Sequence, residues 1–267
     1  MKSPRMLMIA LMGLIPTGAF AHGPEGHPPD PNLHVDPTLK DCSVMFAPEL
    51  TQEAFGRFVR EFGSTSAFKS VAAPMTLRRG GVLVAIEQIN FKVDEHADSW
   101  NDTFYHPDSY HELGSDLSFP KVRLRVGVSD RVDLGAFWTK NMNANYGWVG
   151  FEGRYGILRQ TETMPISLAA RLAYTKTLYV HDMDMHALTA DVTAGRTFWG
   201  MLTPYVGVGG DLVYARETSD AVQLHSETQP VSHALAGVEL RYWHVSLGAE
   251  LNQAALRNFQ FQVAAAF

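Results

Sequence analysis

The sequence predicts an all-β fold, a transmembrane antiparallel up-and-down β-barrel of about ten strands, preceded by a signal peptide and one amphipathic helix. Three observations lead to this prediction. The chain begins with an export signal, residues 80–267 alternate apolar and polar side chains in segments of about ten residues, and the connections between these segments alternate in length. Tilted strands of that length cross a bilayer, and an even number of them with short turns opposite longer loops is typical of membrane barrels.

The segment 1–21 has the layout of a secretory signal peptide. Lys2 and Arg5 precede an apolar run from Met6 to Ile15, and the small-residue triplet Ala19-Phe20-Ala21 follows. We therefore expect cleavage after Ala21. The apolar run is too short to span a bilayer as a helix, so we expect the chain to be exported rather than anchored here.

The composition argues against several classes of protein and partner. The formal net charge is −6 and becomes −8 when Lys2 and Arg5 leave with the signal, which argues against nucleic acid as a partner. After the signal, no apolar run approaches the roughly 18 residues of a helical membrane span. The single cysteine, Cys42, cannot form an internal disulfide, so stability must come from the fold.

Residues 22–47 are predicted to be a disordered tail. The stretch from His22 to Pro37 holds five prolines and three histidines among polar residues, so it has little apolar surface to bury. A histidine-rich metal scavenger is the alternative interpretation. A metal site needs fixed, converging ligands, which favours a simple spacer.

Residues 48–79 are predicted to form an amphipathic helix and a linker, a possible plug. Between Pro48 and Phe62 the apolar residues recur at helical spacing, and Gly63 is expected to end the helix. Because this helix precedes the first strand, we expect it on the periplasmic side. It could plug the lumen, pack on the rim or lie in the lipid interface, and the pattern does not choose among these. The apolar stripe consists of Leu50, Ala54, Phe55, Phe58, Val59 and Phe62.

Residues 80–267 are predicted to form the barrel. The connections at 129–130, 159–164, 197–203 and 243–244 are short or moderate, whereas those at 94–118 and 216–230 are long and polar. The connections at 141–147 and 179–184 fall on the same side as the long ones. The pattern favours ten strands and leaves twelve open. The expected strands are 80–93, 119–129, 131–140, 148–158, 165–178, 185–196, 204–216, 231–243, 244–253 and 258–267.

The two faces of these strands differ in kind. One parity is apolar and is predicted to face lipid, whereas the other mixes small residues with charges and is predicted to line a crowded lumen. The predicted lipid face includes Val122, Leu124, Val126, Val128, Val132, Leu134, Ala136, Trp138, Ile166, Leu168, Ala170, Leu172, Tyr174, Ala234, Ala236, Val238, Leu240 and Tyr242. The predicted lumen charges are Arg123, Arg125, Asp133, Glu152, Arg154, Arg171, Asp191, Asp211, Glu239, Arg241 and Glu250.

Aromatic residues gather where strands would meet the membrane interfaces, as two girdles. The outer girdle is predicted from Trp138, Tyr174, Tyr214 and Phe259, and the inner one from Tyr155, Tyr205, Tyr242 and Phe267. The last ten residues alternate strictly and end on an aromatic, which is unusual for a soluble sheet. A secreted or periplasmic β-sandwich is the alternative fold.

The unit from Gly127 to Gly135, with the sequence GVSDRVDLG, and the terminal Phe267 carry a family resemblance. They resemble small outer-membrane barrel proteins of Gram-negative bacteria, a family whose members are mostly uncharacterised. The resemblance implies localisation in the outer membrane, contact with its lipid, and recognition of the final strand by the barrel-assembly machinery through Phe267. It transfers no catalytic or ligand residue.

Two functions from different classes are compatible with the charged lumen. The charges could line a narrow passive pore or transporter for small solutes and set its ion preference. They could instead neutralise one another and fill a closed barrel, whose function would then be structural or would be binding of a ligand or metal at the external loops. Because an unpaired charge is costly in a poorly hydrated interior, pairing is expected in either case.

The external loops carry possible metal ligands, although their spacing matches no compact ligand motif. The stretch from His181 to His186 also contains Asp-x-Asp and Asp-x-His spacings, and omptin proteases resemble this chain in being ten-stranded outer-membrane barrels. No second half of such a site is evident, so we expect no enzyme activity, cofactor or metal, and the pattern does not predict an oligomeric state. The loop residues considered are Glu95, His96, Asp98, Asp102, His106, Asp108, His111, Glu112, Asp116, His181, Asp182, Asp184 and His186.

Overall fold

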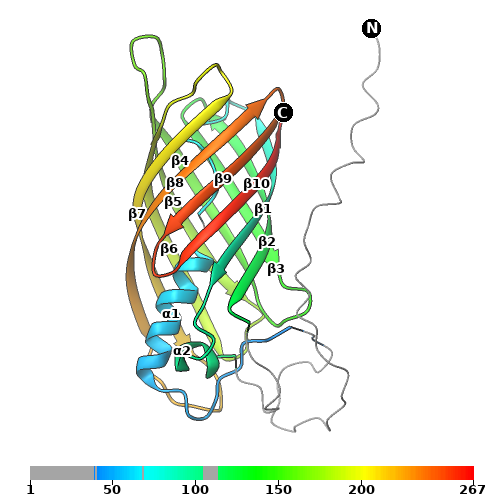
Figure 1. Ribbon diagram of the computed structural model, residues 1–267, viewed down its shortest axis with the longest axis vertical. Coiled ribbons are helices and arrows are strands. Elements are labelled where there is room, and N and C mark those ends of the chain that lie inside the picture. The colour runs from blue at the N-terminus through cyan, green and yellow to red at the C-terminus, as the bar shows by residue number, and fades with distance from the viewer. Residues whose placement is uncertain (1–38, 40, 68, 105–113) are drawn as a thin grey trace.

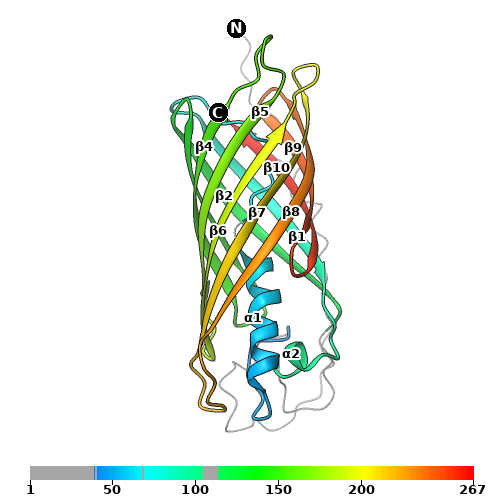
Figure 2. The ribbon, with the colours of Figure 1, turned by 90° about the vertical axis from the view of Figure 1, so that its left-hand side faces the viewer.

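Ten antiparallel strands close into a barrel in the computed structural model, which describes residues 39, 41–67, 69–104 and 114–267 (Figures 1 and 2). The predicted signal peptide and most of the predicted tail lie outside these residues. Each strand pairs with its sequence neighbours, and β1 pairs with β10 to close the wall. The strands are β1 (Val82–Lys92), β2 (Asp116–Ser129), β3 (Val132–Lys140), β4 (Gly147–Leu158), β5 (Ser167–Leu178), β6 (Met183–Gly195), β7 (Leu202–Glu217), β8 (Glu227–Tyr242), β9 (Val245–Gln253) and β10 (Arg257–Ala266).

The predicted alternation of faces holds around the wall. In the β2–β3 pair, Val122 lies opposite Trp138 with both side chains exposed, and the next pair, Arg123 with Phe137, is buried inside. The exterior is a belt of large apolar side chains, whereas the interior holds most of the charged ones. This is the arrangement of a barrel whose outer face contacts lipid. The ten-strand prediction is confirmed.

The two ends of the barrel differ in their connections. We call the end with the short turns at 130–131, 159–166, 196–201 and 243–244 the turn end; it also holds Gly80 and Phe267. The opposite end, with the connection 93–115 and the shorter ones at 141–146, 179–182, 218–226 and 254–256, is the loop end. A short helix, α2 (Asp98–Asn101), lies in the longest of these connections (Figure 1). In membrane barrels short turns face the periplasm and longer loops face outward.

The predicted helix is α1 (Gln52–Ser66), which lies in the loop end of the barrel (Figure 2). Thr51 caps it, because its hydroxyl accepts a hydrogen bond from the Ala54 amide at 3.2 Å. The helix continues past Gly63 to Ser66, so the expected end at Gly63 is wrong. Gly63 is required for packing instead, since a Cβ there would lie 2.2 Å from Cγ1 of Val213.

The expectation of a periplasmic helix assumed that the helix lies at the end of the barrel where β1 begins, and the structure places it elsewhere. The helix lies at the end opposite Phe267, because the chain between α1 and β1 runs along the inside of the barrel to the turn end before the first strand begins (Figure 1). The helix therefore precedes β1 in the sequence but does not lie near the end of the barrel where β1 begins.

The last part of the predicted disordered tail is ordered. Val44, Phe46 and Ala47 are buried, and Met45 forms a bridge with Phe104. The backbone amide of Phe46 donates to the carboxylate of Asp182 at 2.7 Å. The reason is composition: Val44-Met45-Phe46-Ala47 is an apolar run, unlike the proline-rich stretch before it.

Most of the predicted girdle residues are exposed at the two rims, but Tyr205 is not among them. It is 3% exposed and points into the lumen, where its hydroxyl donates to Glu250 at 2.9 Å. Tyr205 lies on the same side of β7 as Gly207, which points inward. A prediction of girdles from aromatics at strand ends alone does not take this side into account. Trp199 and Trp243, exposed in the β6–β7 and β8–β9 turns, add large aromatics at the turn end.

Candidate functional site

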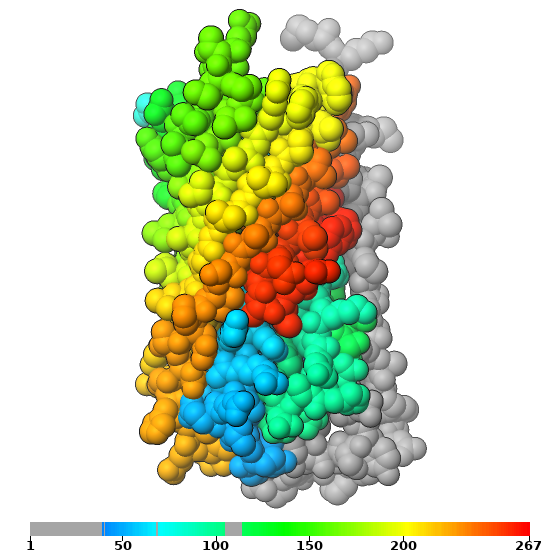
Figure 3. Space-filling model, turned by 60° about the vertical axis from the view of Figure 1, so that its left-hand side comes forward, coloured from blue at the N-terminus to red at the C-terminus, as the bar shows by residue number. Residues whose placement is uncertain are grey.

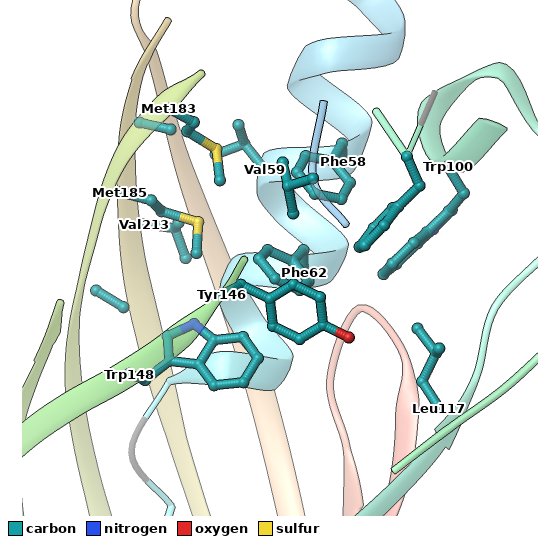
Figure 4. Packing of buried hydrophobic residues seen from close by; sticks show 14 of the residues in the cluster. Phe58, Val59, Phe62, Trp100, Leu117, Tyr146, Trp148, Met183, Met185 and Val213 are labelled. Atoms are coloured by element: carbon teal, nitrogen blue, oxygen red, sulfur yellow. The ribbon is translucent and has the colours of Figure 1, made fainter. Parts of the chain in front are cut away.

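The loop-end half of the lumen is filled by an aromatic plug, which we define as residues 41–66 with α1 at its centre (Figure 4). Phe58 and Phe62 of α1 stack with ring centroids 4.9 Å apart. Phe62 also meets Trp148 of β4 at 5.4 Å, and Phe58 meets Trp100 edge to face at 5.3 Å. Such pairs add to the gain from apolar burial. The indole nitrogen of Trp100 donates to Glu61 at 2.6 Å.

Helix α1 also completes the wall where the β9–β10 hairpin is short. Strand β8 begins at Glu227, but β9 pairs with it only from Ala234 onward, which leaves the edge of residues 227–233 without a strand partner on that side. The helix occupies this notch beside β8 and is visible from outside (Figure 3). Gln52 fixes it there, accepting from the His225 amide at 2.8 Å and donating to the His225 carbonyl at 3.1 Å.

The turn-end half of the lumen is filled by residues 69–79, which we call the strap. Along β2, from the loop end toward the turn end, the strap meets successive residues. Lys121 donates to the carbonyl of Lys69 at 3.0 Å, Arg123 donates to the carbonyl of Val71 at 3.3 Å, and just after the strap the Gly80 amide donates to the carbonyl of Gly127 at 2.7 Å. The strap therefore runs alongside β2 through this half of the barrel.

Other strands of the barrel wall also hold the strap, through its backbone and small side chains. Arg154 donates to the carbonyl of Ala73 at 2.9 Å, and the Ala73 amide donates to Glu239 at 3.2 Å. The Leu77 amide lies 3.0 and 3.1 Å from the two carboxylate oxygens of Asp133. The peptide groups of a chain segment with no strand partner are thereby satisfied by charged side chains of the wall.

Glycines make room for the strap. A Cβ on Gly127 would lie 2.2 Å from the carbonyl oxygen of Arg78, and one on Gly248 would lie 2.7 Å from Cγ1 of Val71. The small residues predicted for the lumen thus do more than fit a narrow barrel, because they let a further segment pass against the wall.

A lattice of buried ion pairs surrounds the strap. Glu87 of β1 pairs with Lys121 at 2.9 Å and with Arg123 at 2.7 Å, and the guanidinium of Arg123 lies 3.5 Å from Glu152. Glu152 in turn accepts from the strap hydroxyl of Ser70 at 3.0 Å. Buried charges are tolerated when they are paired and hydrogen-bonded in this way.

The lattice continues across the lumen. Arg171 donates to Asp191 at 3.0 Å through Nε and to Ser70 at 2.9 Å. His233 lies between two carboxylates, 3.8 Å from Asp191 and 3.3 Å from Asp211. The strap contributes a charge of its own, because Lys69 pairs with Asp211 at 2.8 Å.

The structure places the predicted lumen charges inside the barrel, with Arg241 as a partial exception. The side chain of Arg241 is 34% exposed and pairs with Glu239 at 2.6 Å near the turn end. Four members of the lattice, Glu87, Lys121, Lys69 and His233, were not predicted. Parity would have found Glu87, which alternates with the outward Val84 and Ile86. The buried predicted charges are Arg123, Arg125, Asp133, Glu152, Arg154, Arg171, Asp191, Asp211, Glu239 and Glu250.

A cleft of about 670 Å³ lies at the turn end, with the strap as one wall. Gln160 joins the two turns that border it, accepting from the Thr197 amide at 2.7 Å and donating to the Thr197 carbonyl at 2.9 Å. Arg159 and Arg196 line the cleft, together with the acidic Glu162. The cleft lies at the turn end of the filled lumen, and we call it the vestibule.

The loop residues considered as metal ligands do not form a site in the part of the chain that the structure describes, where no group of three or more His, Cys, Asp or Glu side chains has an arrangement that could hold a metal ion. His106, Asp108, His111 and Glu112 lie outside that part. Asp102, another of these loop residues, is described, and burial raises the pKa of its carboxyl above its usual range.

The stretch His181 to His186 is divided between two environments. Asp182 is buried and binds the plug through Phe46, and it pairs with His181 at 2.9 Å. Asp184 and His186 follow on the outward parity of β6, 3.3 Å apart. Asp182 and the Asp184–His186 pair therefore lie in different environments.

The wall has the properties that a bilayer demands of a β-structure. Its closure satisfies the strand backbones without an open edge, its exterior is an apolar belt with exposed aromatics at the rims, and its charges lie inside. The chain therefore folds as a ten-stranded transmembrane β-barrel. Among the described residues, no helix is long and apolar enough to cross a membrane.

Comparison with solved structures finds distant likenesses. The COG4313 outer membrane channel from Pseudomonas putida F1 is 9% identical with a TM-score of 0.46, covering 75% of this chain and 100% of that one. Ail, the attachment invasion locus protein of Yersinia pestis, is 11% identical with a TM-score of 0.32, covering 71% and 99%. The KdgM porin is 10% identical with a TM-score of 0.33, covering 69% and 99%. No protein-family model and no curated protein matches the sequence.

Proposed function

We propose that the protein is a narrow passive pore for small solutes that is closed at rest by its own N-terminal residues. The observation that carries this proposal is the content of the lumen. The wall encloses a charged interior, and what fills that interior is a plug and a strap that belong to none of the ten strands. If these residues were displaced, the wall that remains would present paired charges and glycines to water, as a pore lining does.

The contacts of the plug allow such a displacement. At the outer surface α1 exposes charged side chains, including Arg57 and Arg60, so a water-facing side already exists. The inner side rests on apolar contacts and on few hydrogen bonds. Removal of the plug would also open the notch beside β8, which α1 fills. The turn-end vestibule would then become the inner mouth, and Arg159 and Arg196 there would favour small anions.

A permanently closed barrel is the second candidate, and one observation favours it. The strap is bound by buried charges at every level, from Lys69 with Asp211 to Leu77 with Asp133. A segment held in this way behaves as part of the fold. Function would then lie at the external loops, as a structural or ligand-binding surface.

Single-channel conductance in a planar bilayer separates the two. The full mature chain is compared with a variant lacking residues 22–79, the plug and the strap together, and heat-shifted gel mobility serves as the folding control for both. We expect no conductance or rare steps from the full chain and discrete, reproducible steps from the deletion variant. A folded deletion variant that never conducts would contradict the pore and support the closed barrel.

The exposed terminal aromatic supports a second proposal, that the assembly machinery recognises the last strand. Phe267 pairs through its backbone with Val82, at 2.8 and 3.0 Å, while its ring is 67% exposed and lies against His244. The aromatic ring of Phe267 is therefore accessible, although its backbone amide and carbonyl are hydrogen-bonded to Val82. Phe267→Ala should lower the amount of folded protein in the outer membrane of cells without changing refolding of the purified chain into lipid. Equal amounts in cells would contradict this proposal.

A further inference from the structure

The segment between residues 41 and 81 runs through the inside of the barrel (Figure 1). At the loop end, the Asp41 amide donates to the carbonyl of Asn143 at 2.9 Å, and Asn141 donates to the Asp41 carboxylate at 3.1 Å. Both partners belong to the β3–β4 connection. Val44 is held by Asn145 of the same connection, at 2.8 Å. Residues 41–44 are therefore fixed to the loop end of the barrel.

The same segment ends at the opposite rim. After α1 and the strap, the Gly81 carbonyl accepts from the Gly127 amide at 2.9 Å, and β1 starts beside Phe267. Between Asp41 and Gly81 the chain thus passes once through the full depth of the barrel, from the loop end to the turn end (Figures 1 and 2).

We propose that the protein is threaded through its own barrel, so that residues 39–47 lie at its extracellular end, with Leu39 accessible from outside the cell, while β1 begins at the periplasmic rim. Two features fix the direction. The turn end has the compact connections and both ends of the strand series, which in membrane barrels face the periplasm. The residues that anchor Asp41 and Phe46 belong to the opposite connections, which face outward.

Threading has a consequence for assembly. Val71 lies against the lumen face at Gly248, and Lys69 and Leu77 are bound to Asp211 and Asp133 of different strands. A strap gripped from several sides cannot be drawn through after the wall has closed without breaking these buried pairs. The segment must therefore be in place as β1 and β10 pair, and the barrel carries its own N-terminal residues outward during closure.

Cysteine labelling of intact cells tests the topology. Cys42 is the only cysteine, and burial raises the pKa of its thiol to about 11, so it reacts slowly at neutral pH. In a Cys42→Ser background, three single variants are made: Leu39→Cys at the start of the described chain, Asp220→Cys in the β7–β8 loop as an outer control, and Glu162→Cys in the β4–β5 turn as an inner control. Each is exposed to a membrane-impermeant maleimide before and after the outer membrane is permeabilised.

The proposal expects Leu39→Cys and Asp220→Cys to be labelled in intact cells, and Glu162→Cys only after permeabilisation. Labelling of Leu39→Cys only after permeabilisation, with Asp220→Cys labelled in intact cells, would overturn it. Labelling of Glu162→Cys but not Asp220→Cys in intact cells would overturn it as well, because the barrel would then be inverted. If Leu39→Cys fails to fold, the native Cys42 is labelled at raised pH with the same criteria. These results are independent of whether the barrel conducts.

Discussion

The two halves of the lumen are closed by different means. At the loop end, α1 buries an aromatic stripe against Trp100, Trp148 and their neighbours. At the turn end, the strap has mostly small side chains and is held by charged residues of the wall, such as Arg154 and Asp133. Apolar contacts lose strength in proportion to the area removed, whereas a buried ion that loses its partner is strongly destabilising. The loss of one side chain should therefore destabilise the two halves by different means, through an unpaired buried charge in one and through a cavity in the other.

The largest effect is expected in the ionic half. Arg171→Ala removes the partner of Asp191 and a donor to Ser70, and leaves carboxylates buried without their guanidinium. We expect a loss of about 3–5 kcal/mol in the free energy of unfolding, with membrane insertion retained. Urea titration followed by tryptophan fluorescence in lipid measures it. Arg57→Ala, on the exposed side of α1, is the control, and a loss for Arg171→Ala no larger than for this control would contradict the ionic account.

A loss of comparable size is expected in the apolar half. Phe62→Ala leaves a cavity among Phe58, Trp148 and Tyr146, which costs about 3–5 kcal/mol. The two variants should differ in conductance. The Phe62 change loosens the plug and should raise the frequency of current steps, whereas Arg171→Ala leaves the plug itself packed. The same step frequency in both variants would mean that the halves do not close the lumen separately.

The sequence predicts much of the wall and little of what fills it. Period-2 alternation placed Arg123 inside and Leu124 outside, because the buried and lipid faces of a strand demand opposite chemistry. The aromatic stripe of α1 predicted a buried helix face. Its location was not predictable from its place before β1, since a linker long enough to span the lumen lets the helix lie at either end. The predicted helix end at Gly63 is wrong because a glycine that ends a helix and a glycine that allows close packing look alike in sequence.

Lattice members from the strap were the hardest to predict. Lys69 lies in no strand, so parity cannot place it, whereas the parity of β1 does place Glu87 inside, among apolar inward neighbours such as Ala85 and Ile89. Pairing across the lumen depends on strand register and on the path of the strap, which a single sequence does not specify.

The lipid face offers an intermediate effect. Leu124→Arg places a charge on the outward side of β2, well inside the apolar belt, and should cost about 2–4 kcal/mol. Trp138→Arg, nearer the outer rim, should cost about 0–1 kcal/mol, since the penalty falls toward the interface. Unfolding titrations of both variants in lipid check the difference. Equal costs would contradict the assignment of Trp138 to the outer girdle.

The smallest effect is expected at the start of α1. Thr51→Ala removes the hydroxyl that accepts from the Ala54 amide, and should cost about 0.5–2 kcal/mol. Thr51→Ser keeps the acceptor and serves as the matched control. Unfolding titration again gives the value, and a serine variant as unstable as the alanine variant would show that the cap does not matter.

The central claim is that the strap lies inside the barrel, and a disulfide tests it most directly. In a Cys42→Ser background, Val71→Cys is combined with Gly248→Cys, whose Cβ would lie within 2.7 Å of Cγ1 of Val71. The control combines Val71→Cys with Leu247→Cys, one residue away on the lipid face. After mild oxidation of the folded protein, peptide mass spectrometry should find the crosslink between positions 71 and 248 and none between 71 and 247. Free thiols at 71 and 248 in folded, oxidised protein would contradict the account.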